Sequence, residues 1–153
     1  MSQITDFYSG KFTIGLDSLT DIIYRNDAWW EHGHDFIQWC FPLPEASKAV
    51  PLSPVATQED FDCIAESPTL KMRMVALLGR YVTFLESTEK WRRKEDHNHM
   101  RITRVLRSLS YCGLNDVAYD FLQYVKAQVG HIVPSRTVWY WDEALKRSPA
   151  WLR

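Results

Sequence analysis

Two histidine pairs are the first residues whose type and spacing could support chemistry. His32 and His34 lie two residues apart in the sequence, as do His97 and His99, and an aspartate stands close to each pair. Side chains two residues apart on a helix point about 200° away from each other and cannot share a metal ion, although they can in a loop or strand. Neither pair has HExxH or cysteine-rich spacing. We therefore expect capping or core roles for these histidines, and the sequence predicts no metal ligands and no cofactor.

Nucleophilic catalysis has weak support from the sequence. It contains no GxSxG motif, no glycine-rich phosphate loop and no recognisable Cys–His context. Cys40, Cys63 and Cys112 form no CxxC pair and are odd in number, so neither a disulfide framework nor a zinc ribbon is expected. Each lies among apolar residues and is predicted to be a small buried side chain. A non-enzymatic protein is favoured, and a metal-dependent enzyme built on the histidine pairs is an alternative.

The segment between Trp29 and Trp39 combines tryptophans with acidic and polar side chains. If residues 34–41 form a helix, one face is apolar and a second face carries polar side chains and Trp39. A tryptophan on an outer face needs a cover, either another element or a ligand. An aromatic and acidic pocket would suit a cationic group or the amino terminus of a peptide, whereas the alternative is a buried polar network. The candidate ligand-binding residues are Trp29, Trp30, Glu31, His34, Asp35, Gln38 and Trp39.

A basic stripe is the second candidate surface. Residues 71–107 carry ten basic and four acidic side chains, whereas residues 1–70 carry three and eleven. Arginines on one side of a helix, preceded by a basic segment that contains a tryptophan, could bind a nucleic acid. The pI near 6.5 and the interspersed acidic residues favour a solvated face or internal ion pairs instead. The residues of this alternative site are Arg92, Arg93, Arg101, Arg104 and Arg107.

Helices are the elements that must position these residues. Capping residues, prolines, glycines and apolar spacing predict helices from about residue 17, over 34–41, from residue 57, over 68–86, over 98–112, from 115 to about 130, and from 135 to about 146. Thr57 with Asp60 resembles a capping box. The helix over 68–86 is apolar on most sides, so we expect it to be central and buried, with Gly79 allowing close helix–helix contact.

Length and composition are those of a globular domain. The chain has 153 residues, 46% of them hydrophobic, and a net charge of −1, which is enough for one domain with its own core. Seven tryptophans, seven tyrosines and seven phenylalanines indicate aromatic core packing more than ligand stacking. The sequence shows no signal peptide and no apolar run that could span a membrane, so a cytoplasmic location is expected. Residues 1–16 are expected to form an irregular N-terminal arm before a helical domain of residues 17–153.

Two stretches of the chain carry long, specific patterns. Residues 29–43 read WWEHGHDFIQWCFPL, and residues 97–114 read HNHMRITRVLRSLSYCGL. These stretches resemble the conserved region of opioid growth factor receptors, whose patterns are close to WWExxHDYIQWLFPL and HNHxRITRILxSLxxLGL. The resemblance covers roughly residues 24–145 and implies an all-helical domain. In animals, members of this family are described as receptors for an enkephalin peptide that are associated with the nucleus and restrain cell growth. The family supplies no catalytic residues that could be transferred to this chain.

These observations predict a compact, all-α single domain of about six or seven helices. The function implied by the resemblance is that of a non-enzymatic binding domain, with a protein or peptide as its partner. Two alternatives stay open: a nucleic-acid-binding domain that uses the basic stripe, and a metal-dependent enzyme.

Overall fold

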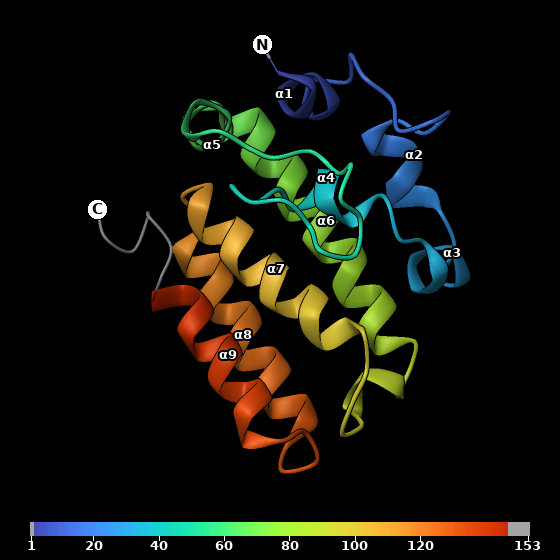
Figure 1. Ribbon diagram of the computed structural model, residues 1–153, viewed down its shortest axis with the longest axis vertical. Helices are drawn as coiled ribbons and strands as arrows, with labels where there is room; N and C mark the ends of the chain where they lie inside the picture. Colours follow the sequence, from blue (N-terminus) through green and yellow to red (C-terminus); the bar gives the residue numbers. More distant parts are fainter. Residues whose placement is uncertain (1, 147–153) are drawn as a thin grey trace. The chain divides into compact units, whose positions relative to one another are not determined.

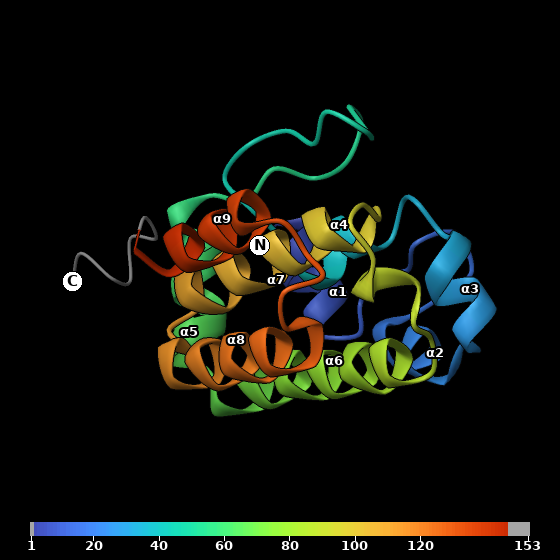
Figure 2. The same cartoon turned by 90° about the horizontal axis from the view of Figure 1, so that it is seen from below.

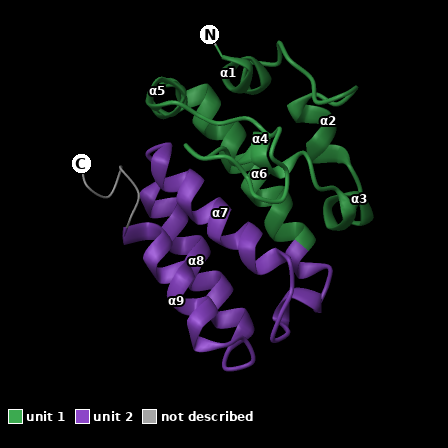
Figure 3. Ribbon diagram, viewed as in Figure 1, with its two compact units in different colours: residues 1–84 green, residues 85–153 purple. Residues whose placement is uncertain are grey.

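The structure is a computed structural model that describes residues 2–146, and this part of the chain is all-α (Figure 1). The predicted fold class is therefore confirmed. The described residues form nine α-helices and one short 3₁₀ helix, and the two helices not foreseen from the sequence, α1 and α3, have six residues each. None of the helices in this part of the chain is long and apolar enough to cross a membrane. The chain divides into two compact units, residues 1–84 and 85–153 (Figure 3), while a single domain over 17–153 stays a prediction.

The first unit contains five short helices and most of a long one. The short helices differ in how they are capped, but each begins close to a polar residue or a turn of the chain. Their bounds are Gln3–Tyr8 for α1, Leu19–Tyr24 for α2, Asp27–His32 for α3, Ile37–Cys40 for α4 and Gln58–Glu66 for α5, and the long helix α6 spans Pro68–Glu86. The capping box predicted at the start of α5 is confirmed, because the Thr57 side chain accepts a hydrogen bond from Asp60 N while the Asp60 side chain accepts one from Thr57 N.

The N-terminal segment is not wholly irregular, which corrects the expectation for residues 1–16. Residues 3–8 form α1, and the side chain of Ser2 caps this helix by accepting a hydrogen bond from Thr5 N. Ile4 and Phe7 are buried, and the Ser2 hydroxyl also donates to the carboxylate of Asp60 on α5. The apolar side of α1 was missed because a helix of six residues gives too short a periodic pattern.

The helix predicted over residues 34–41 is also wrong in its extent. Only Ile37–Cys40 is helical. Gly33 is extended, with φ −67° and ψ 139°, and Phe36 at the N-cap provides no side-chain hydrogen bond to start the helix earlier. His34 and Asp35 consequently precede α4 and do not lie on its face.

Helix α6 has one buried side and one exposed side. Met74, Leu77 and Tyr81 are buried, but the opposite side is exposed, so the expectation of a helix buried on most sides is wrong. A Cβ placed on Gly79 would meet nothing within 4 Å, so this glycine does not mediate a close contact between helices. We call this exposed side the α6 outer face, and its residues are Met72, Val75, Ala76, Gly79 and Thr83.

The second unit is built on three helices that pack against one another. Helices α7 (Asn98–Tyr111), α8 (Asn115–Val129) and α9 (Ser135–Lys146) lie side by side in both views (Figures 1 and 2). They follow the 3₁₀ helix η1, Lys90–Arg92. Gly113 after α7 and Gly130 after α8 have positive φ angles of 78° and 55°. A residue without a side chain lets the chain reverse at these two helix ends.

Replacing Gly79 with alanine is expected to stabilise the protein. The added methyl group meets no neighbour, and alanine has the higher helix propensity, so the free energy of unfolding should rise by roughly 0.5–1 kcal/mol. The matched control is Gly33→Ala, whose Cβ would lie 2.8 Å from the Phe36 ring and should destabilise by about 1–3 kcal/mol. Urea unfolding of both variants measures these changes. A loss of stability in Gly79→Ala would contradict the finding that no neighbouring atom lies close to this position.

Candidate functional site

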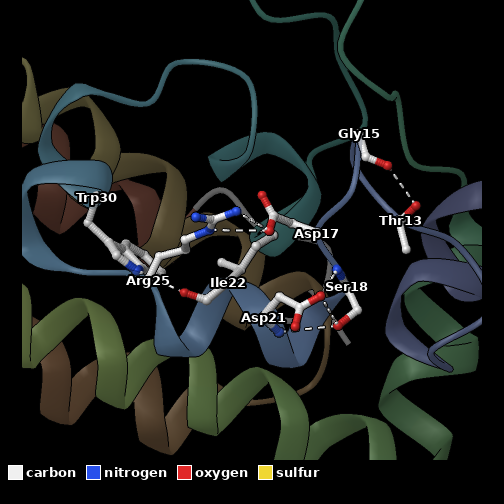
Figure 4. A network of polar contacts seen from close by, with 8 residues as sticks. All are labelled: Thr13, Gly15, Asp17, Ser18, Asp21, Ile22, Arg25 and Trp30. Atoms are coloured by element: carbon white, nitrogen blue, oxygen red, sulfur yellow. Dashed lines mark hydrogen bonds and ion pairs between the residues drawn. The ribbon is translucent and has the colours of Figure 1, made fainter.

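Trp30, one of the predicted ligand-binding residues, is part of the core. It is fully buried, and its indole N–H donates a hydrogen bond of 3.1 Å to the carbonyl of Ile22 in the last turn of α2 (Figure 4). The rings of Phe36 and Tyr81 lie 4.9 and 6.2 Å from its ring, centroid to centroid. A tryptophan so enclosed holds helices together and offers no surface to a ligand in this arrangement.

Trp29 lies beside Trp30 but remains half-buried. The two rings are 6.4 Å apart in an edge-to-face arrangement, and Phe36 covers Trp29 at 4.3 Å. The guanidinium of Arg25 stands 5.7 Å from the centre of the Trp29 ring and forms an ion pair of 2.6 Å with Asp17 (Figure 4). The cation–π position predicted for a ligand is therefore occupied by an arginine of the same chain.

A second arginine makes the same kind of contact with Trp30. The guanidinium of Arg80 on α6 lies 5.4 Å from the centre of the Trp30 ring. Its Nη2 donates hydrogen bonds of 2.8 Å to both the carboxylate of Asp27 and the carbonyl of Arg25. These contacts fasten the α2–α3 corner to α6.

Trp39 is covered by the chain itself. Its ring stacks on Phe12 at 5.0 Å with an interplanar angle of 24°, and Phe7 lies 6.1 Å away. Trp39 was expected to be covered by another element or by a ligand, and the element that covers it is the N-terminal segment. Gln38 is buried and donates from its side-chain amide to the carbonyl of His34 at 3.1 Å.

The predicted ligand-binding set is divided by these contacts. The structure brings Trp29 and Trp30 together, while Trp39 packs on aromatic residues from the N-terminal segment. The members that keep accessible surface are Trp29, Glu31 and Trp39, which are half-buried, and His34 and Asp35, which are exposed.

The histidine pair near α7 is split between core and surface. His99 is buried, with Nε2 2.7 Å from the carbonyl oxygen of Trp91, and Trp141 donates its indole N–H to the carbonyl of His99 at 3.1 Å. The expected core role is confirmed for His99. His97 is exposed and makes no side-chain cap bond at the start of α7, where Asp96 instead accepts a hydrogen bond from Asn98 N.

The predicted basic stripe is not a continuous exposed surface. Arg101 is only 7% exposed, Arg104 and Arg107 are half-buried, and Arg92 lies half-buried with its guanidinium 5.4 Å from the centre of the Trp91 ring. Arg93 is the exposed member of the set. Helical residues three positions apart are offset by about 60° around the helix axis. The three arginines of α7 are therefore spread over its surface and do not form a line along it.

Sequence reasoning missed a small cavity of about 220 Å³ in the first unit. Its walls come from three separate segments: the end of α1, the start of α2, and α6. No motif connects these segments, so no signal in the sequence could have located it. The lining residues are Tyr8, Gly10, Ser18, Leu19, Thr20 and Arg73.

The cysteines are not placed as nucleophiles. Cys40 and Cys112 are fully buried, and burial raises the pKa of both thiols well above the usual range. Thiolate formation is therefore suppressed at both positions.

Comparison with known proteins gives one match. The family model described as the opioid growth factor receptor conserved region matches residues 6–129. No curated protein and no solved structure matches the chain.

Trp30→Phe tests the structural role of this residue. It removes the bond to the carbonyl of Ile22 and leaves a partly empty site, so the free energy of unfolding should fall by roughly 2–4 kcal/mol. Trp29→Phe is the matched control, because this neighbouring ring is half-buried and should cost about 1 kcal/mol or less. Thermal or urea unfolding compares the two variants, and equal losses would contradict the difference in their roles.

Alkylation of the folded protein should be selective for one cysteine. Iodoacetamide at pH 8 is expected to modify Cys63, which is half-buried, and to spare Cys40 and Cys112 until the protein unfolds. Peptide mass spectrometry before and after addition of denaturant measures the pattern. Rapid labelling of Cys40 in the native state would show that its surroundings are more open than described.

Proposed function

The chain belongs to the opioid growth factor receptor conserved-region family, and on this premise we propose that it is a non-enzymatic binding module for a protein or peptide partner. The family description names receptors, which supports a binding role. The three free cysteines support a reducing compartment, in agreement with a cytoplasmic location.

The α6 outer face is the observation that carries this proposal. Met72 is 73% exposed and Val75 is 41% exposed, and Ala76, Gly79 and Thr83 are exposed beside them. None of these five residues is charged. An exposed helix face ordinarily carries charged and polar side chains, and an uncharged apolar face is typical of a contact surface.

An amphipathic helix is the partner element that this face fits best. Met72 to Thr83 spans about 17 Å along the α6 axis at about 1.5 Å per residue, which is three turns of a second helix. Ala76 and Gly79 stand near its middle, where small side chains let two helix axes approach to about 8 Å. Lys71, half-buried at the edge of the face, would pair with an acidic residue beside the apolar stripe of the partner.

The surface around Trp29 remains a second predicted contact site. Glu31, His34, Asp35 and the half-buried Trp39 are the other members of the predicted set that keep accessible surface. A cationic ligand at Trp29 would have to displace Arg25, which Asp17 holds in place. Neither the buried Arg101 nor the hydrogen-bonded His99 supports the nucleic-acid or metal-dependent alternatives.

Site-specific photo-crosslinking tests the α6 outer face. A benzophenone amino acid at position 75, introduced in the cells that produce the protein, is expected to capture one defined protein partner. The same label at Gln123, an exposed residue of α8, is the control. With the captured partner purified, Val75→Glu should weaken binding at least about tenfold, because a charge is then desolvated without a counter-charge, while Gln123→Glu should leave it unchanged. Equal crosslinking at both positions would overturn the proposal.

A further inference from the structure

The cavity at the junction of α1, α2 and α6 contains a positive charge without an acidic partner. Arg73 on α6 is half-buried and lines the cavity. Among the described residues its only hydrogen bond runs from Nη1 to the carbonyl of Tyr8. The other two arginines of residues 1–84 each pair with an aspartate, Arg25 with Asp17 and Arg80 with Asp27.

This difference stands out because the N-terminal part of the chain is rich in acidic residues. Residues 1–70 carry eleven acidic and three basic side chains, yet no acidic residue lines the cavity. Asp21, close to the cavity in the sequence, is not one of its lining residues, and its carboxylate accepts hydrogen bonds from the backbone N–H and hydroxyl of Ser18 (Figure 4). The bond from the Ser18 backbone, followed by that from its hydroxyl, holds the pKa of Asp21 below the usual range.

The remaining polar groups of the cavity favour a ligand that accepts hydrogen bonds. The phenol of Tyr8 donates to the carbonyl of Cys40, and the hydroxyl of Ser18 is engaged with Asp21. The Thr20 hydroxyl has no partner among the described residues and can donate, as can the Nε and Nη2 of Arg73. Leu19 and the Tyr8 ring supply apolar wall.

We propose that this cavity binds a small oxyanion, a carboxylate or phosphate group, through the guanidinium of Arg73 and the hydroxyl of Thr20. The planar guanidinium offers parallel N–H donors that match two oxygens of either group. The cavity volume of about 220 Å³ corresponds to roughly seven waters at about 30 Å³ each. It therefore accommodates an anionic group with a few attached atoms. The site is independent of the α6 outer face.

Titration with two simple anions tests the site. Sodium phosphate and sodium acetate are added separately at constant ionic strength to ¹⁵N-labelled full-length protein. The Nε–H signal of Arg73 and the amide signals of Leu19 and Thr20 are followed by NMR. We expect these signals to move together in a saturable manner, with a Kd of about 1–10 mM for the tighter anion. Tighter phosphate binding indicates a phosphorylated ligand, and tighter acetate binding indicates a carboxylate ligand.

Four variants separate specific binding from general charge effects. Arg73→Gln should weaken binding about tenfold or more, whereas Lys48→Gln, which removes the same charge from an exposed position of the first unit outside the cavity, should change it less than about twofold. Thr20→Val, at an exposed position, should weaken it roughly threefold. Arg73→Lys retains the charge and replaces Arg73→Gln as the test if that variant does not fold. It should weaken binding because lysine lacks the parallel N–H donors of the guanidinium. Equal effects of Lys48→Gln and either Arg73 variant, or signals that fail to saturate, would overturn the site.

Discussion

Hydrogen bonds from buried indoles to backbone carbonyls are the interaction on which this structure depends. Trp30, Trp91 and Trp141 are all fully buried, and their indole N–H groups donate to the carbonyls of Ile22, Leu85 and His99, respectively. The first two carbonyls lie in the last turns of α2 and α6, where they also accept backbone N–H bonds from Arg25 and Thr88. Each tryptophan thus buries a large apolar area while its own indole N–H, which would be costly to bury without an acceptor, is satisfied.

The two stretches that resemble the family pattern are explained largely by this requirement. Trp30 and Phe36 in the first stretch pack together at 4.9 Å, and His99 in the second stretch accepts a bond from Trp141 while its own ring contacts Trp91. Arginines complete the arrangement in the first unit, where Arg25 and Arg80 each join a tryptophan ring to an aspartate. A family signature made largely of such residues preserves a fold.

Local signals in the sequence predicted those elements whose ends are set by local chemistry. Thr57 with Asp60 located the start of α5, and Gly113 and Gly130 located the ends of α7 and α8. The prediction made α4 too long, because apolar spacing over eight residues suited a helix, whereas only Ile37–Cys40 is helical and the N-cap residue Phe36 makes no side-chain hydrogen bond. The contact of Trp39 with Phe12 could not be foreseen, since it joins segments far apart in the chain. The apolar pattern of α6 also could not reveal that Val75 faces outward, because covered and uncovered apolar faces have the same periodicity.

Exchange of the indole N–H protons with solvent deuterium, followed by NMR for each assigned tryptophan, measures how firmly the buried indoles are held. If the indoles of Trp30, Trp91 and Trp141 hold the fold, their protons should exchange slowly, at rates set by opening of the structure. The half-buried Trp29 should exchange much faster. Exchange of the Trp30, Trp91 and Trp141 protons at the rate found for Trp29 would contradict the account, because these indoles would then be open to solvent and available to a ligand.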